Sequence, residues 1–203
     1  MEFKENHILI GLGGTGGKVL KAFRKRLFQE YTAEARARLP LGYVYVDSSK
    51  EMMQPNDITF RVLGQDASFD ESEFVFIRGV NLQSVFSNPS GFPGLKGFIG
   101  DPEVMQKTIG NVEAAAGQKR RAGRILFGSS VQSYLNTLKN QYVKVKGINN
   151  TSKLNIHIFT GLAGGTGSGA IIDVLAQTRY KYPDSKIILY AMVPEHTPPG
   201  TCD

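Results

Sequence analysis

Cysteine is almost absent from this 203-residue chain, whose one cysteine, Cys202, lies next to the last residue. A single cysteine cannot form an internal disulfide, which excludes a disulfide-stapled scaffold and fits a reducing cytoplasm. Long apolar runs are also missing, because none approaches the roughly 20 residues that a membrane-spanning helix needs. Residues 1–6 are too polar and charged for a secretory signal. We therefore expect a cytoplasmic protein without a membrane span.

Metal-ligand patterns are equally scarce. The three histidines, His7, His157 and His196, are scattered, and no group of His, Cys and Asp has the spacing of a metal site. We therefore expect no side chain to serve as a metal ligand. The formal net charge of +6 indicates an anionic partner. No basic platform interleaved with aromatic residues is present, so the sequence favours a nucleotide over a nucleic acid.

The chain also lacks internal repeats and low-complexity tracts. Apolar residues make up 41% of it and charged residues 21%, which is typical of a globular protein. At 203 residues the chain can bury one sizeable core. We expect a single domain of ordinary size.

Glycine, in contrast, is concentrated in residues 161–169, which read G-L-A-G-G-T-G-S-G. An apolar strand is expected over 156–159 and a helix over 170–182. Glycines let the backbone approach an anion closely, and the first N–H groups of a helix point outward at its positive end. Thr166 and Ser168 add hydroxyl donors. Because a plain turn needs only one or two glycines, this stretch predicts a phosphate-binding loop.

A second unit of the same kind stands at the amino terminus. An apolar strand is expected over 7–10, the glycine-rich run covers 11–17, and a helix is expected over 18–31. The run lacks the first glycine and the final Ser or Thr of a Walker P-loop. Taken alone, it matches the dinucleotide fingerprint G-x-G-x-x-G at Gly11, Gly13 and Gly16.

Residues 163–169, A-G-G-T-G-S-G, resemble the signature of the tubulin/FtsZ family of GTPases, small-Gly-Gly-Thr-Gly-small-Gly, at all seven positions. In this resemblance the run 11–17 corresponds to the family's first glycine loop, which lies under the diphosphate. The resemblance implies GTP or GDP as the ligand, together with Mg²⁺. The nucleotide contacts implied in the two loops are Gly11, Gly13, Gly14, Thr15, Gly16, Ala163, Gly164, Gly165, Thr166, Gly167 and Ser168.

Two acidic residues follow expected strands. Asp47 ends the strand 43–46, where an acidic residue commonly contacts a ribose or a metal-bound water. An alternative for Asp47 is a helix N-cap for residues 50–53. Glu195, in the proline-rich loop after the last strand, could fill the acidic role of the family's ribose loop.

Two further stretches partly resemble the family. Residues 100–103, G-D-P-E, begin a helix and resemble the FtsZ loop that contacts the terminal phosphate, which makes Gly100 a candidate. Residues 117–124 resemble a Gly-Gln-x-Arg-x-x-Gly-Arg pattern of divergent bacterial tubulin-like proteins. Arg120 and Arg124 stand one helical turn apart, so both could face the terminal phosphate. The alternative is a solvated basic turn.

The rest of the chain predicts ordinary elements. We expect an edge strand over 58–63, a long polar loop with short helical pieces over 65–94, one helix over 125–145, and a final buried strand over 186–193. The inner helix positions are expected to be Leu126, Ser130, Ser133, Leu138 and Tyr142, then Ile171, Ile172, Val174, Leu175 and Thr178.

This order of elements predicts an α/β fold, a Rossmann-like and mainly parallel sheet with helices on both faces, as in a tubulin/FtsZ-type GTPase domain. Ligands bind outside the carboxyl ends of such strands, where both glycine loops lie. The domain is expected to cover 1–203 and to stop before the family's central helix. The region 65–98 is interpreted as a loop-rich insertion.

The first interpretation of function is the guanine-nucleotide-binding half of a tubulin-like GTPase that self-associates longitudinally into filaments. In the family, the acids that activate water come from a loop past this stretch and act on a neighbouring subunit, so the chain alone is expected to hydrolyse little GTP. A Rossmann NAD(P)-dependent oxidoreductase would use the first loop and Asp47, but it leaves the second loop unexplained. A nucleotide-binding structural module without turnover is the third interpretation.

Overall fold

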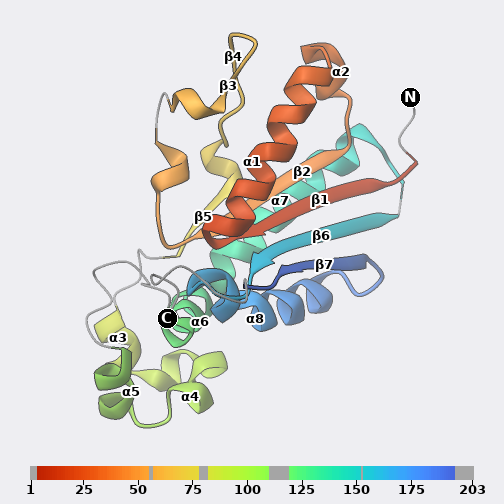
Figure 1. The fold of residues 1–203 in the computed structure, drawn as a ribbon. Helices are drawn as coiled ribbons and strands as arrows, with labels where there is room; N and C mark the ends of the chain where they lie inside the picture. The colour runs from red at the N-terminus through yellow and green to blue at the C-terminus, as the bar shows by residue number, and fades with distance from the viewer. Residues whose placement is uncertain (1–3, 55–56, 78–81, 110–118, 152, 195–203) are drawn as a thin grey trace.

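The computed structural model describes residues 4–54, 57–77, 82–109, 119–151 and 153–194. This part of the chain contains a five-stranded sheet in the order β5-β2-β1-β6-β7, and all four pairings are parallel (Figure 1). The strands are β1 (Asn6–Leu12), β2 (Leu41–Asp47), β5 (Phe74–Phe76), β6 (Leu154–Gly161) and β7 (Lys186–Met192).

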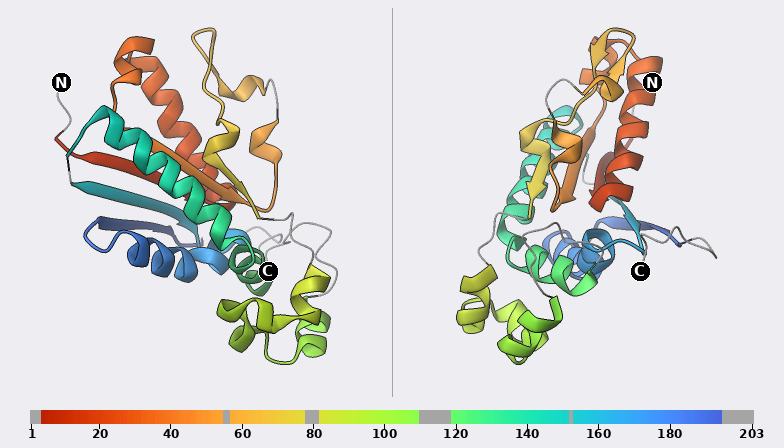
Figure 2. Two further views of the ribbon diagram at one scale, coloured as in Figure 1. Left: turned by 180° about the vertical axis from the view of Figure 1, so that it is seen from behind. Right: turned by 60° about the vertical axis from the view of Figure 1, so that its left-hand side comes forward.

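Helices cover both faces of the sheet, which confirms the expected α/β fold class. Helix α1 (Gly13–Glu30) packs on one face, and α7 (Val131–Ile148) and α8 (Thr166–Lys181) pack on the other (Figure 2). Side chains alternate along β1, so that Ile8 and Ile10 enter the core under α7 and α8 while Leu9 faces α1.

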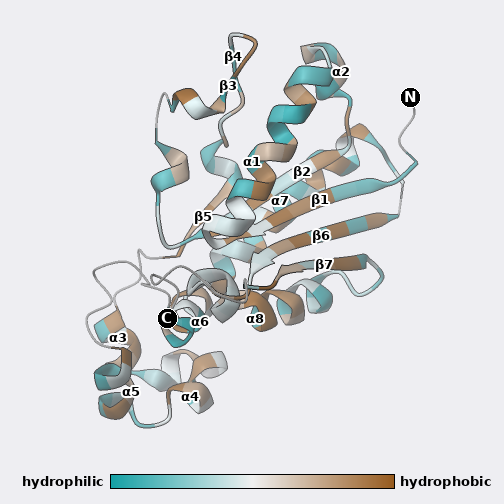
Figure 3. Cartoon of the chain, in the orientation of Figure 1, coloured by the Kyte–Doolittle hydropathy of each residue, from teal (hydrophilic) through white to brown (hydrophobic). Residues whose placement is uncertain are grey.

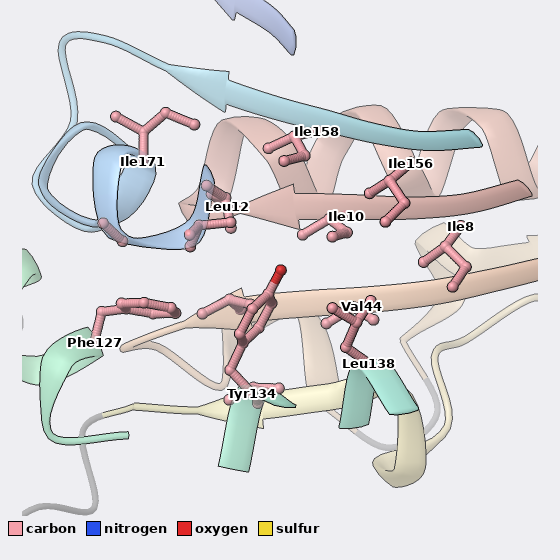
Figure 4. Packing of buried hydrophobic residues seen from close by; sticks show 14 of the residues in the cluster. Ile8, Ile10, Leu12, Val44, Phe127, Tyr134, Leu138, Ile156, Ile158 and Ile171 are labelled. Carbon is pink, nitrogen blue, oxygen red and sulfur yellow. The ribbon is translucent and has the colours of Figure 1, made fainter. Parts of the chain in front are cut away.

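The main core lies between the sheet and α6, α7 and α8, where α6 spans Arg120–Gly128 (Figure 4). Branched aliphatic residues of the central strands fill it, as is typical of parallel sheets buried on both faces. Tyr134 is fully buried in this core, and its hydroxyl lies 2.6 Å from that of Thr178. The core therefore joins α7 to α8 beneath the sheet.

A separate helical region lies below the carboxyl ends of the strands in Figure 1. It consists of α3 (Leu82–Ser87), η4 (Pro89–Gly91), α4 (Pro93–Ile99) and α5 (Pro102–Ile109). These helices share a small core with Ala122 and Ile125 of α6. The short helical pieces and the helix beginning near Pro102 are thus confirmed. That this region is an insertion stays a prediction.

The expectation of an edge strand over 58–63 is wrong. This stretch forms a 3₁₀ turn and a two-residue strand in a small hairpin, with Ile58 and Leu63 exposed. A turn at Leu63 and Gly64, both with positive φ, closes the hairpin. The edge of the main sheet next to β2 is instead formed by β5, within the stretch expected to be a loop. The short elements here are α2 (Ala33–Ala37), η1 (Glu51–Met53), η2 (Ile58–Phe60), β3 (Arg61–Val62), β4 (Gln65–Asp66) and η3 (Glu71–Glu73).

The single helix expected over 125–145 is two helices, α6 and α7, separated at Ser129 and Ser130. Ser129 bonds back to the carbonyl of Ile125, which helps to end α6 and lets α7 start in a new direction. The expectation that Ser133 and Ile172 point inward is also wrong, because both are exposed. The other expected inner positions are at least partly buried.

The strand expected to be buried over 186–193 is confirmed as β7 but not as buried. It pairs only with β6, and its residues Leu189 and Tyr190 are 42% and 41% exposed. An edge strand has a neighbour on one side only, which an apolar run by itself does not reveal. Figure 3 shows that hydrophobic residues nonetheless concentrate along β7 as they do along β6.

Candidate functional site

The two glycine loops meet at the carboxyl edge of the sheet. Strands β1 and β6 are neighbours, with Leu12 paired to Thr160, so the loops that follow them lie side by side. A β-carbon on Gly13, whose φ is 65°, would lie 3.1 Å from the backbone nitrogen of Gly167. The absence of a side chain at Gly13 therefore lets the two loops touch through their backbones.

Several loop glycines are required by packing within the chain. A β-carbon on Gly16 would overlap the carbonyl oxygen of Phe159, so α1 lies directly on β6. A β-carbon on Gly167 would lie 2.9 Å from the carbonyl oxygen of Leu12. These glycines hold the two units together whether or not a ligand binds.

Gly14 and Gly164 are different, because a β-carbon on either would meet no atom within 4 Å. One stands in each loop, Gly14 exposed and Gly164 partly exposed. Neither has a positive φ, so neither the backbone nor the packing of the described residues requires glycine there. Both positions are therefore open in the unliganded chain, and glycine there is not explained by contacts among the described residues.

Two of the three long helices in the described residues, α1 and α8, begin at these loops. Helix α1 has 18 residues and α8 has 16, and neither has a side-chain cap at its amino terminus. The first N–H groups of any helix have no intrahelical acceptor, and here no side chain caps them either. Both helices therefore present a positive end at the carboxyl ends of the strands. This arrangement is suited to an anion with several oxygen atoms.

The hydroxyl groups of the second loop already have partners in the chain. The Thr166 hydroxyl is 2.9 Å from that of Ser48, and Thr166 is buried. Ser168 donates to the carbonyl of Gly164, one helical turn back. Backbone N–H groups are therefore the more available donors, and the expected contacts from Thr15, Thr166 and Ser168 hydroxyls to phosphate stay predictions.

Asp47 lies at the end of β2 and is only 5% exposed. Its carboxylate accepts hydrogen bonds from the Tyr45 hydroxyl at 2.6 Å and from the backbone N–H groups of Ser48 at 2.7 Å and Ser49 at 3.3 Å. Burial raises the pKa of the Asp47 carboxyl above its ordinary value, although these hydrogen bonds lower it in part. The N-cap alternative is wrong, because the 3₁₀ turn after β2 is preceded by Lys50 and has no side-chain cap.

Arg120 and Arg124 of α6 do not point at one target. The Arg120 guanidinium donates to the carbonyl of Leu162 at 3.1 Å, in the turn that leads into the second loop. Arg124 instead forms a two-pronged ion pair with Asp173 of α8, at 3.0 and 3.4 Å, and lies over the ring of Phe98. Because Arg124 is part of a packed contact, the solvated-turn alternative does not describe it.

Helix α6 packs directly against the second loop. A β-carbon on Gly123 would overlap the carbonyl oxygen of Gly165, and one on Gly169 would overlap the carbonyl oxygen of Arg120. The chain can approach this closely only because glycine stands at both helices. The candidate residues drawn from the sequence did not include Gly123, Gly169 or Ser48, although Gly123 belongs to the 117–124 pattern and Gly169 is the last position of the 163–169 signature.

The remaining candidates are Gly100, Ala163 and Glu195. Gly100 ends α4 with a φ of 60°, and its backbone N–H donates to the carbonyl of Lys96 in that helix. Ala163 is partly exposed beside Gly164. Glu195 lies outside the described residues.

Searches for other kinds of site among these residues gave negative results. No three His, Cys, Asp or Glu side chains of the described ranges group closely enough to hold a metal ion. None of the described helices combines the length and the apolar character that spanning a membrane requires.

The parallel sheet, with two glycine loops at the carboxyl ends of its strands, is an α/β, Rossmann-like fold. A family model described as "Tubulin like" matches residues 8–200, and the chain belongs to this family. No match was found among the curated proteins.

Solved structures share the fold. CetZ from Methanosaeta thermophila strain DSM 6194 matches with a TM-score of 0.60 and 12% identity, over 97% of this chain and 39% of that one. CetZ1 from Haloferax volcanii, described as a GDP-bound monomer, matches with a TM-score of 0.51 and 18% identity, over 97% of this chain and 44% of that one. The chain thus spans less than half the length of these structures.

Proposed function

We propose that the chain binds a guanine nucleotide, GTP or GDP, with the two glycine loops holding its phosphates. The observation that carries the proposal is that two uncapped helices, α1 and α8, begin at the glycine loops, and each loop has a glycine, Gly14 or Gly164, at which a β-carbon would meet no atom within 4 Å. A phosphate chain fits there, because it accepts hydrogen bonds from free N–H groups and is attracted to the positive helix ends. The family membership and the GDP-bound state named for CetZ1 support the choice of nucleotide.

In this proposal the second loop holds the phosphates nearest to α6. Arg120, beside Leu162, is the cation best placed to reach a terminal phosphate, whereas Arg124 is occupied by Asp173. Arg120 therefore distinguishes GTP from GDP more than Arg124 does. This narrows the two-arginine hypothesis to one residue.

Mg²⁺ is proposed as a companion of the nucleotide. The described residues provide no cluster of carboxylates and histidines for it. Mg²⁺ commonly binds phosphate oxygens and keeps several waters, so it needs few protein ligands. Bound in that way, it would neutralise charge on the phosphates, and we assign no residue of this chain to it.

Hydrolysis and assembly are proposed for a longer protein rather than for this chain. The chain spans less than half of the CetZ structures that it matches. Near the loops, Asp47 is buried and saturated with donors, so it is badly placed to orient an attacking water. We therefore expect GTPase activity and filament formation to need further residues and a second subunit, and turnover by this chain alone to stay near background.

The dinucleotide alternative is weaker for a specific reason. An NAD site would use the first loop together with an acid that reaches a ribose hydroxyl. Asp47 is the acid in that position, and its oxygens are occupied by Tyr45, Ser48 and Ser49. A nucleotide-binding module without turnover remains the alternative for the complete protein, and a turnover assay across protein concentrations separates the two.

The test is calorimetric titration of GDP, GTP and NADH into wild type, Gly164→Ala and Gly147→Ala. A β-carbon at either glycine meets no atom within 4 Å, but Gly147 lies in α7, away from the loops. We expect GDP and GTP to bind wild type and Gly147→Ala equally, and Gly164→Ala at least tenfold more weakly. Tight NADH binding without competition by GDP would overturn the proposal, as would equal GDP affinity in all three proteins.

A further inference from the structure

The carboxyl group of Asp47 is buried next to the proposed phosphate site without being open to it. Asp47 is 5% exposed, and three donors from β2 and the turn after it surround its two oxygens. A carboxylate whose only role is to stabilise a turn does not need to lie near a ligand site. Its position at the carboxyl edge of the sheet, beside the two loops, gives it a further consequence.

One hydroxyl pair connects the Asp47 turn to the second glycine loop. Asp47 fixes the backbone of Ser48, and the Ser48 hydroxyl lies 2.9 Å from that of Thr166, the first residue of α8. Ser48 and Thr166 are both buried, so water does not compete for this contact. The Thr166 side chain is also among the groups that lower the pKa of the Asp47 carboxyl, against the larger effect of burial, which raises it.

We propose that Asp47 is a positioning residue for the nucleotide site: it orients Thr166 through Ser48, and it takes up a proton when a phosphate binds at the amino terminus of α8. The inference rests on the proposed function. A bound polyphosphate brings several negative charges close to a carboxylate that is shielded from water. Like charges at such distances disfavour the ionised carboxyl, so phosphate binding and protonation of Asp47 favour each other.

The surroundings of Asp47 contain little that could compete with this coupling. Burial and hydrogen bonds from Tyr45, Ser48, Ser49 and Thr166 are the influences on its pKa from the described residues around it. Tyr45 is the titratable neighbour, and burial holds the pKa of its phenol far above the ordinary value, so it stays neutral. Glu51, on η1, acts on Tyr45. Burial already raises the pKa of Asp47 in the unliganded chain.

Proton uptake on binding is measured by titrating GDP calorimetrically at a series of pH values, in two buffers of different ionisation enthalpy. The two buffers together give the number of protons taken up with each GDP. Asp47→Asn is the matched variant, because an amide can accept from Ser48 and Ser49 and hold the Tyr45 hydroxyl while carrying no charge. The phosphate of GDP titrates in both proteins, so the difference between them belongs to Asp47.

We expect wild type to take up more protons than Asp47→Asn, by at most one, and its affinity to rise by up to about tenfold per pH unit as the pH falls toward the pKa of Asp47. Asp47→Asn should lack this extra dependence. Equal proton uptake by the two proteins would overturn the inference. If wild type bound no GDP at any pH, the proposed function itself would fail, which is a separate result.

Two further variants keep the inference testable if Asp47→Asn does not fold. Tyr45→Phe removes the donor that lowers the pKa of Asp47, so its proton uptake should peak at higher pH than in wild type, and an unmoved peak would count against the inference. Ser48→Ala breaks the bridge to Thr166 but keeps the carboxyl. It should weaken GDP binding about three- to tenfold while leaving proton uptake intact, and unchanged affinity would remove Ser48 from the positioning role.

Discussion

The two glycine loops look alike in sequence but rest on different supports. The first lies on the sheet, because Gly16 packs against the carbonyl of Phe159 on β6. The second lies against a helix, because Gly165 packs on Gly123 of α6. Helix α6 in turn shares a core with α3, α4 and α5. The first loop is therefore supported by the central sheet, whereas the second is supported by α6 and, through it, is connected to the helical region of α3, α4 and α5.

The largest expected effect tests the support of the first loop. Gly16→Ala places a β-carbon on the Phe159 carbonyl oxygen and should lower the free energy of unfolding by about 3 kcal/mol through overpacking. Gly14→Ala, two residues earlier, meets no atom and should fold normally while losing nucleotide affinity. Urea unfolding and GDP titration measure the two effects. An equal loss of unfolding free energy in both variants would mean that packing against the Phe159 carbonyl does not support the first loop.

The next effect tests the support of the second loop. Gly123→Ala pushes α6 away from Gly165 and should cost about 2 kcal/mol of folding free energy, with a loss of nucleotide affinity as the loop shifts. Gly147→Ala, an open helical glycine in α7, should instead stabilise by up to about 1 kcal/mol. Thermal unfolding separates them. Unchanged GDP binding in folded Gly123→Ala would mean that α6 does not set the shape of the loop.

A smaller effect distinguishes Arg120 from Arg124, both on α6. Arg124→Gln removes the ion pair with the partly exposed Asp173 and should lower stability by about 1 kcal/mol, with similar effects on GTP and GDP binding. Arg120→Gln should leave stability almost unchanged and weaken GTP more than GDP. Parallel titrations with the two nucleotides measure this difference. The reverse pattern would place Arg124 at the terminal phosphate.

The smallest effect concerns the opposite end of the sheet. His7 and His157 lie 3.1 Å apart through their ring nitrogens, and burial lowers the pKa of both. The unfolded chain therefore binds more protons below about pH 6.5, so stability is complete above that pH and falls as the pH drops. The loss should stay below about 1 kcal/mol, since both residues are only partly buried. Unfolding of a His7→Asn, His157→Asn variant should lack this slope, and an unchanged slope would point to other groups.

Local patterns were enough for the units that carry the site. The apolar strands before each glycine run, the helices after them and the parallel sheet follow from periodicity and from the backbone demands of glycine. The same reasoning failed where long-range packing decides. The run 58–63 has strand-like alternation, but the aromatic pair in β5 fits beside β2 and forms the edge of the sheet.

Local sequence predicted the two strand–glycine–helix units, the family signature and the parallel α/β class, because each depends on residues close together in the chain. The three-dimensional packing was needed to show which loop glycines are tightly packed and which are open, that Arg124 pairs with Asp173, and that Asp47 is buried. The Ser48–Thr166 contact joins residues 118 positions apart, and Arg124 and Asp173 are separated by 49. Such pairs are set by how the elements pack in three dimensions, which no local periodicity records.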